Sequence, residues 1–113
     1  MPWYYNPQSG GSKIPLMLHD KIRKQAHAYE QTRPWYPDSS LKLRFKSQFC
    51  YLDAAKEGEA PYPLGRLRYF SDDRWSLAFY TYSNERYEPC LFPNGEWRGS
   101  LEQAIAICEV YLY

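Results

Sequence analysis

Cationic and apolar side chains alternate in two stretches of the sequence, residues 41–46 and 66–70. This alternation has the period of two that is typical of a β-strand with one buried face. If the apolar positions point inward, one sheet face gathers the five cations Lys42, Arg44, Lys46, Arg66 and Arg68, together with the rings of Phe70, Tyr80 and Tyr82. Cations attract phosphates, and rings stack on bases at about 1–3 kcal/mol per base. The pattern predicts a surface for single-stranded nucleic acid, made of Lys42, Arg44, Arg66, Arg68, Tyr80 and Tyr82.

Two other interpretations of this predicted face stay open. It can be a solvated surface whose arginines pair with Glu85 or Glu88, or it can bind a negatively charged protein. A helix packed over the same face would exclude the nucleic-acid hypothesis.

A second set of candidate residues is aromatic and lies outside the regular alternation. Residues 1–13, MPWYYNPQSGGSK, form a Pro- and Gly-punctuated arm, and residues 33–40, RPWYPDSS, form a loop. Trp and Tyr dominate binding hot spots, which makes Trp3, Tyr4, Trp35 and Tyr36 the predicted protein-binding residues. The alternative is that the arm packs on its own domain. The favoured hypothesis is a small non-enzymatic module that acts through protein contacts, and homodimerisation through a sheet edge or the arm is compatible with it.

Catalytic signatures are missing from the sequence. It contains no Gly-rich phosphate loop, no G-x-S-x-G and no H-E-x-x-H. His19 and His27 are eight residues apart, about 80° around a helix, whereas a metal pair needs a spacing of three or four. We therefore expect no catalytic residues, metal or cofactor. A pocket lined by His19 or His27 with carboxylates would favour an enzyme instead.

Composition limits the class of protein. The 113 residues carry a net charge of +1 and allow one domain with one modest core. Residues 1–46 contain eight Lys and Arg against three Asp and Glu, and residues 47–113 contain six against ten. Three Cys without C-x-x-C spacing argue against a disulfide framework or a zinc site and favour a reducing cytoplasm. No apolar run reaches the 18–20 residues, roughly, of a membrane span, and no signal peptide opens the chain.

Periodicity and turn signals define the expected elements. We predict a helix from Pro15 to about Gln31, strands in 41–46 and 49–53, and a meander of strands over 66–97. Whether 41–53 is one bent strand or two strands around a turn at 46–48 stays open. Pro89 predicts an edge strand or a bulge, and residues 54–63 are expected to form a loop. Ser100 and Gln103 form a capping box that begins a C-terminal helix with a buried stripe.

These elements give an α+β class. The expected architecture is a single domain over 14–113, with an N-terminal helix, four to five antiparallel strands in a meander, and a C-terminal helix. Each helix has one apolar face, so both are predicted to cover the same side of the sheet and to leave the other side open.

The segments SGGSKIP and FYTYSNERYEPC resemble the SGG-x-KIP opening and FYTYSNE-x-YEPC core of a family of short, uncharacterised bacterial proteins. The likeness extends over most of the chain and differs most in the length of 54–63. These motifs carry no assigned activity, so the resemblance implies one compact domain and no particular function.

Overall fold

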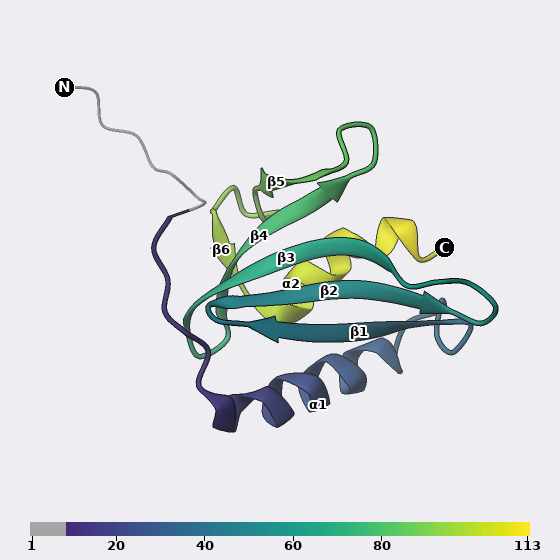
Figure 1. Ribbon diagram of the computed structural model, residues 1–113, viewed down its shortest axis with the longest axis horizontal. Helices are drawn as coiled ribbons and strands as arrows, with labels where there is room; N and C mark the ends of the chain where they lie inside the picture. The colour runs from purple at the N-terminus through teal and green to yellow at the C-terminus, as the bar shows by residue number, and fades with distance from the viewer. Residues whose placement is uncertain (1–8) are drawn as a thin grey trace.

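Five antiparallel strands follow one another along the chain and lie side by side in the same order (Figure 1). The computed structural model describes residues 9–113. The strands are β1 (Ser39–Lys46), β2 (Phe49–Lys56), β3 (Tyr62–Ser71), β4 (Arg74–Thr81) and β5 (Arg86–Cys90). A short sixth strand, β6 (Arg98–Gly99), pairs with β4 beyond the end of β5. The predicted meander is confirmed, and Pro89 lies in the edge strand β5 as expected.

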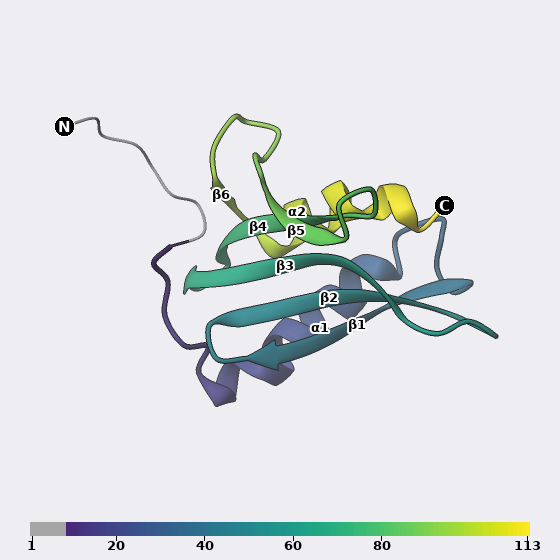
Figure 2. The ribbon, with the colours of Figure 1, turned by 45° about the horizontal axis from the view of Figure 1, so that its top comes forward.

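The helical segments are η1 (Leu16–Leu18), α1 (His19–Glu30), α2 (Leu101–Cys108) and η2 (Glu109–Tyr111). Helices α1 and α2 contact each other and pack on the same face of the sheet (Figure 2). Between helices and sheet lies one core that includes Ile22, Leu67, Trp75 and Ile105. Among residues 9–113 no helix lies over the opposite sheet face, so the predicted α+β arrangement with one open face is confirmed. None of the described helices is long and apolar enough to cross a membrane.

A tight hairpin joins β1 to β2 and answers the question that the sequence left open. Lys46 pairs with Phe49, and Ser47 takes a φ of 55°, the left-handed value that two-residue hairpin turns require. Residues 41–53 are therefore two strands. The expected loop over 54–63 is wrong in extent, because β2 continues to Lys56 and β3 begins at Tyr62.

The β3–β4 turn anchors both helices to the sheet. Asp72 pairs with Lys21 of α1 at 3.2 Å, and the Asp73 carboxylate accepts a hydrogen bond from Gln25 at 3.2 Å. The same Asp73 oxygen accepts the Leu101 N–H at the start of α2, at 3.0 Å. The predicted capping box is also present, with Ser100 and Gln103 bonded reciprocally. The β3–β4 turn therefore not only joins two strands but also holds α1 and α2 in place through its two carboxylates.

The three cysteines are expected to differ sharply in reactivity. Cys50 and Cys108 are fully buried, and burial raises the pKa of each thiol to about 12. Cys90 is half-buried, and burial raises its thiol pKa above the usual value. We expect one thiol, Cys90, to react with a disulfide reagent in the folded protein near neutral pH, because reaction requires an accessible thiolate. All three should react in guanidinium chloride; rapid loss of two or more thiols from the folded protein would contradict this.

Candidate functional site

Cross-strand pairing places the predicted cations in rows on the open face of the sheet, which we call the outer face. Lys46 lies opposite Phe49, which lies opposite Arg68. One row along, Arg44 lies opposite Tyr51, which lies opposite Arg66. The described outer-face positions are Ser40, Lys42, Arg44, Lys46, Phe49, Tyr51, Asp53, Ala55, Pro63, Arg66, Arg68, Ser76, Ala78, Tyr80, Tyr87, Pro89 and Arg98.

Guanidinium groups stack on the aromatic rings of this face. The Arg66 guanidinium lies 4.6 Å from the centroid of Phe49 and 5.3 Å from that of Tyr87. Arg68 lies 4.7 Å from the Phe49 centroid, and Arg44 lies 4.8 Å from that of Tyr51. Such contacts hold a planar cation at a fixed height over the sheet. The rings therefore position the charges.

Tyrosine rings form a connected cluster beside these cations. Tyr87 contacts Tyr51 edge to face at 5.7 Å and Tyr80 at 5.0 Å, and Tyr80 contacts Tyr82 at 4.8 Å. Burial raises the pKa of Tyr87, and burial raises that of Tyr82 to about 12. These phenols stay neutral at physiological pH and do not repel an anionic ligand. The Tyr82 hydroxyl donates to the Pro63 carbonyl at 2.6 Å, and its ring contacts Tyr111, which places Tyr82 at the margin of the face.

One carboxylate, Asp53, lies on the described outer face and is nearly buried, with 8% of its surface exposed. It accepts from Arg44 through both oxygens, with the shorter N···O distance at 2.5 Å. This hydrogen bond raises the pKa of Arg44. A hollow of about 430 Å³ lies beside the pair, lined by Lys42, Arg44, Asp53, Pro61, Pro63 and Tyr87.

The structure brings Lys42, Arg44, Arg66, Arg68 and Tyr80 to one face, as predicted, with Tyr82 at its margin. The alternative in which these arginines pair with Glu85 or Glu88 is wrong for Glu88, because Glu88 lies opposite Phe79 on the other face. It accepts from Arg86 and Asn84 instead.

Three aromatic residues of the outer face were missed from the sequence, namely Phe49, Tyr51 and Tyr87. A two-residue turn at Ser47 and Gln48 would have predicted Phe49 and Tyr51, because it places Phe49 opposite Lys46 and Tyr51 opposite Arg44. Phe70, also expected on this face, lies within the break in the β3–β4 register. The guanidinium of Arg98, which lies opposite Ser76, stacks on its ring 4.0 Å from the centroid.

The four predicted protein-binding residues do not form an exposed aromatic cluster among the described residues. Trp3 and Tyr4 lie outside the described residues. The expectation that Trp35 is an exposed anchor is wrong, because only 4% of its surface is accessible and its indole N–H donates to Glu109 at 2.8 Å. Arg33 bonds both oxygens of the same carboxylate, at 2.9 and 3.0 Å. Tyr36 is half-buried against the core.

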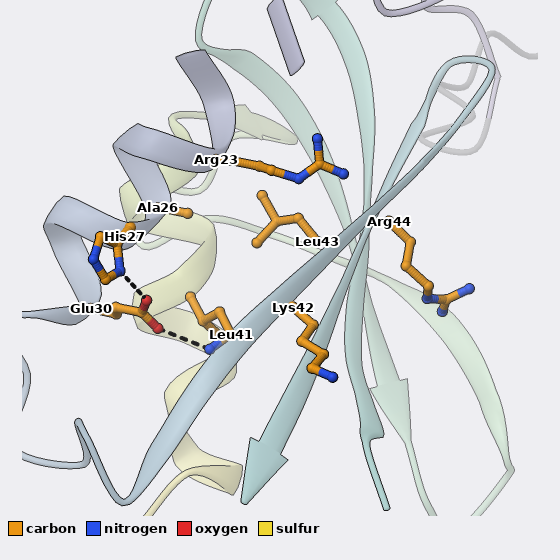
Figure 3. A pocket seen from close by; sticks show the side chains of 8 residues that line it. All are labelled: Arg23, Ala26, His27, Glu30, Leu41, Lys42, Leu43 and Arg44. Carbon is orange, nitrogen blue, oxygen red and sulfur yellow. Dashed lines mark hydrogen bonds and ion pairs between the residues drawn. The ribbon is translucent and has the colours of Figure 1, made fainter. Parts of the chain in front are cut away.

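A groove of about 380 Å³ separates α1 from β1 and contains a histidine paired with a carboxylate (Figure 3). His27 Nδ1 lies 2.7 Å from one oxygen of the buried Glu30, and the other oxygen accepts the Leu41 N–H at 2.9 Å. A carboxylate-oriented imidazole can serve as a general base. However, the eight lining residues include no Ser, Thr or Cys that could act as a nucleophile.

His19 lies apart from this pair, stacked on Phe45 at 4.1 Å. Within residues 9–113 no group of three or more His, Cys, Asp and Glu side chains could hold a metal ion. Glu30 ties the end of α1 to the edge of β1 through the hydrogen bond that it accepts from the Leu41 N–H.

Comparison with family models, with curated proteins and with solved structures gave no match to this chain. The resemblance to a bacterial family stays a prediction.

Proposed function

We propose that this protein is a binding module whose outer face takes single-stranded nucleic acid. The observation that carries the proposal is the set of arginine guanidinium groups held over aromatic rings on a sheet face without a covering helix among the described residues. Side chains of this kind supply phosphate contacts and stacking surfaces together.

Charge distribution supports an anionic ligand. Among the described outer-face positions, six cations (Lys42, Arg44, Lys46, Arg66, Arg68 and Arg98) occur with the single carboxylate of Asp53, whereas the whole chain carries only +1. The remainder of the molecule is therefore net acidic. A phosphate backbone is attracted to the outer face and repelled elsewhere, which orients the encounter.

A single strand suits this face better than a duplex. Arg66, Arg68 and the neighbouring rings are half-buried and lie flat against the sheet. A duplex is usually read by a helix or a β-ribbon that projects into its major groove, and the outer face has no such projection among the described residues (Figure 2). Unstacked bases can lie flat on such a sheet, and the hollow beside Asp53 leaves room next to the tyrosine cluster.

The test is fluorescence anisotropy of labelled single-stranded DNA and RNA over a salt series. For the double variant R66A/R68A we expect about 100-fold weaker binding, because each arginine supplies one phosphate or stacking contact. The slope of log affinity against log salt should fall by about 1.4, at roughly 0.7 for each phosphate that an arginine no longer neutralises.

The matched control is K24A/R86A, which removes two exposed cations outside the outer face. It should bind within about twofold of wild type if the contacts are local. No binding at low salt, or equal losses in both double variants, would overturn the proposal. Circular dichroism of each variant establishes that it is folded.

Protein contacts are the second candidate function. The favouring observation is a pair of adjacent apolar side chains at the start of the first helical segment, Leu16 and Met17, which are 81% and 86% exposed. Trp3 and Tyr4 remain proposed contact residues of the same N-terminal region, and a homodimer remains one form of such contact.

We also propose a reducing, cytoplasmic setting and membership of the bacterial family that the sequence resembles. The support for the first is chemical. Three free thiols occur in the chain, with Cys50 and Cys108 buried as packing residues of the core.

A further inference from the structure

Strand β1 is an edge strand, and part of its backbone is directed away from the sheet. The Leu41 N–H donates to Glu30 of α1, so it faces away from β2. In an antiparallel ladder the direction of the backbone groups alternates from residue to residue. The N–H and C=O groups of Leu43 therefore also face outward, into the space between β1 and α1.

That space is the α1–β1 groove, whose two sides differ in chemistry. Ala26, Leu41 and Leu43 form its apolar side, and Arg23 extends over it from α1 (Figure 3). Lys42 and Arg44 point to the opposite side of β1, onto the outer face. Glu30 is the one carboxylate among the lining residues, and both its oxygens already have partners.

We propose that the α1–β1 groove binds an extended peptide as an additional antiparallel strand on β1. The chemistry of the strand edge specifies a peptide in which apolar and acidic residues alternate. Main-chain hydrogen bonds to an exposed edge supply affinity in this mode of recognition, and alternate side chains supply specificity. The chain itself already uses a carboxylate oxygen as an acceptor for this edge, at Leu41.

The alternation follows from the two faces of an added strand. Residues opposite Leu43 would point toward α1, where Ala26 leaves room for an apolar side chain. Residues one position along would point to the outer face, beside Lys42 and Lys46. Arg44 is already engaged by Asp53, so these two lysines are the proposed partners of the acidic side chains.

Charge makes a second copy of this chain a poor occupant of the groove. Two β1 strands paired edge to edge would bring the row Lys42, Arg44 and Lys46 of one copy beside the same row of the other. Like charges across neighbouring strands are destabilising. An acidic strand converts that repulsion into cross-strand pairs.

The experiment uses the full chain and a capped, fluorescein-labelled peptide in which valine alternates with glutamate. The valines should lie opposite outward-facing residues of β1, so their N–H groups should donate to β1. N-methylation of the valine amides should weaken binding at least about tenfold, since each removes one backbone hydrogen bond. N-methylation of the glutamate amides, which face away from β1, should leave affinity within about twofold.

A protein variant tests the acidic side. K42E should weaken binding of the valine–glutamate peptide about tenfold. The same variant should bind a peptide in which lysine replaces glutamate, because the charges are then opposite again. The control K24E, on the solvent side of α1, should change the affinity for neither peptide. Hydrogen exchange should show protection of the Leu43 amide when the valine–glutamate peptide is bound.

Three results would overturn the proposal. These are no binding of the valine–glutamate peptide at low salt, equal effects of the two N-methylation patterns, and sedimentation showing that the chain closes its own β1 edge as a dimer. Failure here would leave nucleic-acid binding intact, because Arg66 and Arg68 lie outside the α1–β1 groove.

Discussion

Replacement of Trp35 by Ala should lower the free energy of unfolding by about 3–5 kcal/mol, the usual cost of truncating a buried aromatic residue. Trp35 follows α1 in a loop, yet only 4% of its surface is exposed to solvent. Its ring packs in the core, and its N–H shares the Glu109 carboxylate with Arg33. W35A removes this packing and leaves a cavity between the loop and η2.

The matched variant W35F separates packing from the hydrogen bond. It keeps an aromatic ring and removes the indole N–H, and Glu109 retains Arg33 as a partner, so we expect a loss of only about 1 kcal/mol. Urea unfolding followed by far-ultraviolet circular dichroism measures both variants. If W35A costs less than W35F, or if neither changes stability, Trp35 is an exposed residue and the protein-contact hypothesis regains its anchor.

Local sequence signals were sufficient for most of the fold. The period of two in 41–46 and 74–81 identifies strands because a sheet with one buried face imposes it directly. The capping box at Ser100 and the buried stripe of α2 are likewise local, since their partners lie within a few turns of one helix. The antiparallel pairing of consecutive strands could also be predicted, because short turns leave each strand beside the one before it.

The candidate site was predictable only in part, because its remaining features depend on contacts between distant residues. Trp35 and its partner Glu109 are 74 positions apart, and no short-range pattern marks them as neighbours. A loop tryptophan therefore looked exposed. Glu30 is similar, because a carboxylate on a helix is ordinarily solvated, and its acceptor role arises only where α1 meets β1.

Replacement of Glu30 by Ala should destabilise the protein by about 1–3 kcal/mol, because it leaves the Leu41 N–H without its acceptor at a partly buried edge. E30Q provides the matched control. Its amide oxygen can still accept from Leu41, so most of the stability should be retained. H27A removes only the half-exposed partner of the other oxygen and should cost less than about 1 kcal/mol. Urea unfolding of the three variants measures these losses of stability and should place E30A as the largest.

The same variants decide between two functions of Glu30. If it caps the edge strand, E30A frees the N–H of Leu41 beside that of Leu43, and the valine–glutamate peptide should bind at least as tightly as to wild type. If Glu30 and His27 instead form a catalytic or ligand-binding pair, E30A and H27A should each abolish that function. Of the two variants, only E30A should also lower the free energy of unfolding substantially. Wild-type stability in E30A would contradict the capping role, because a partly buried edge amide that loses its acceptor should cost stability.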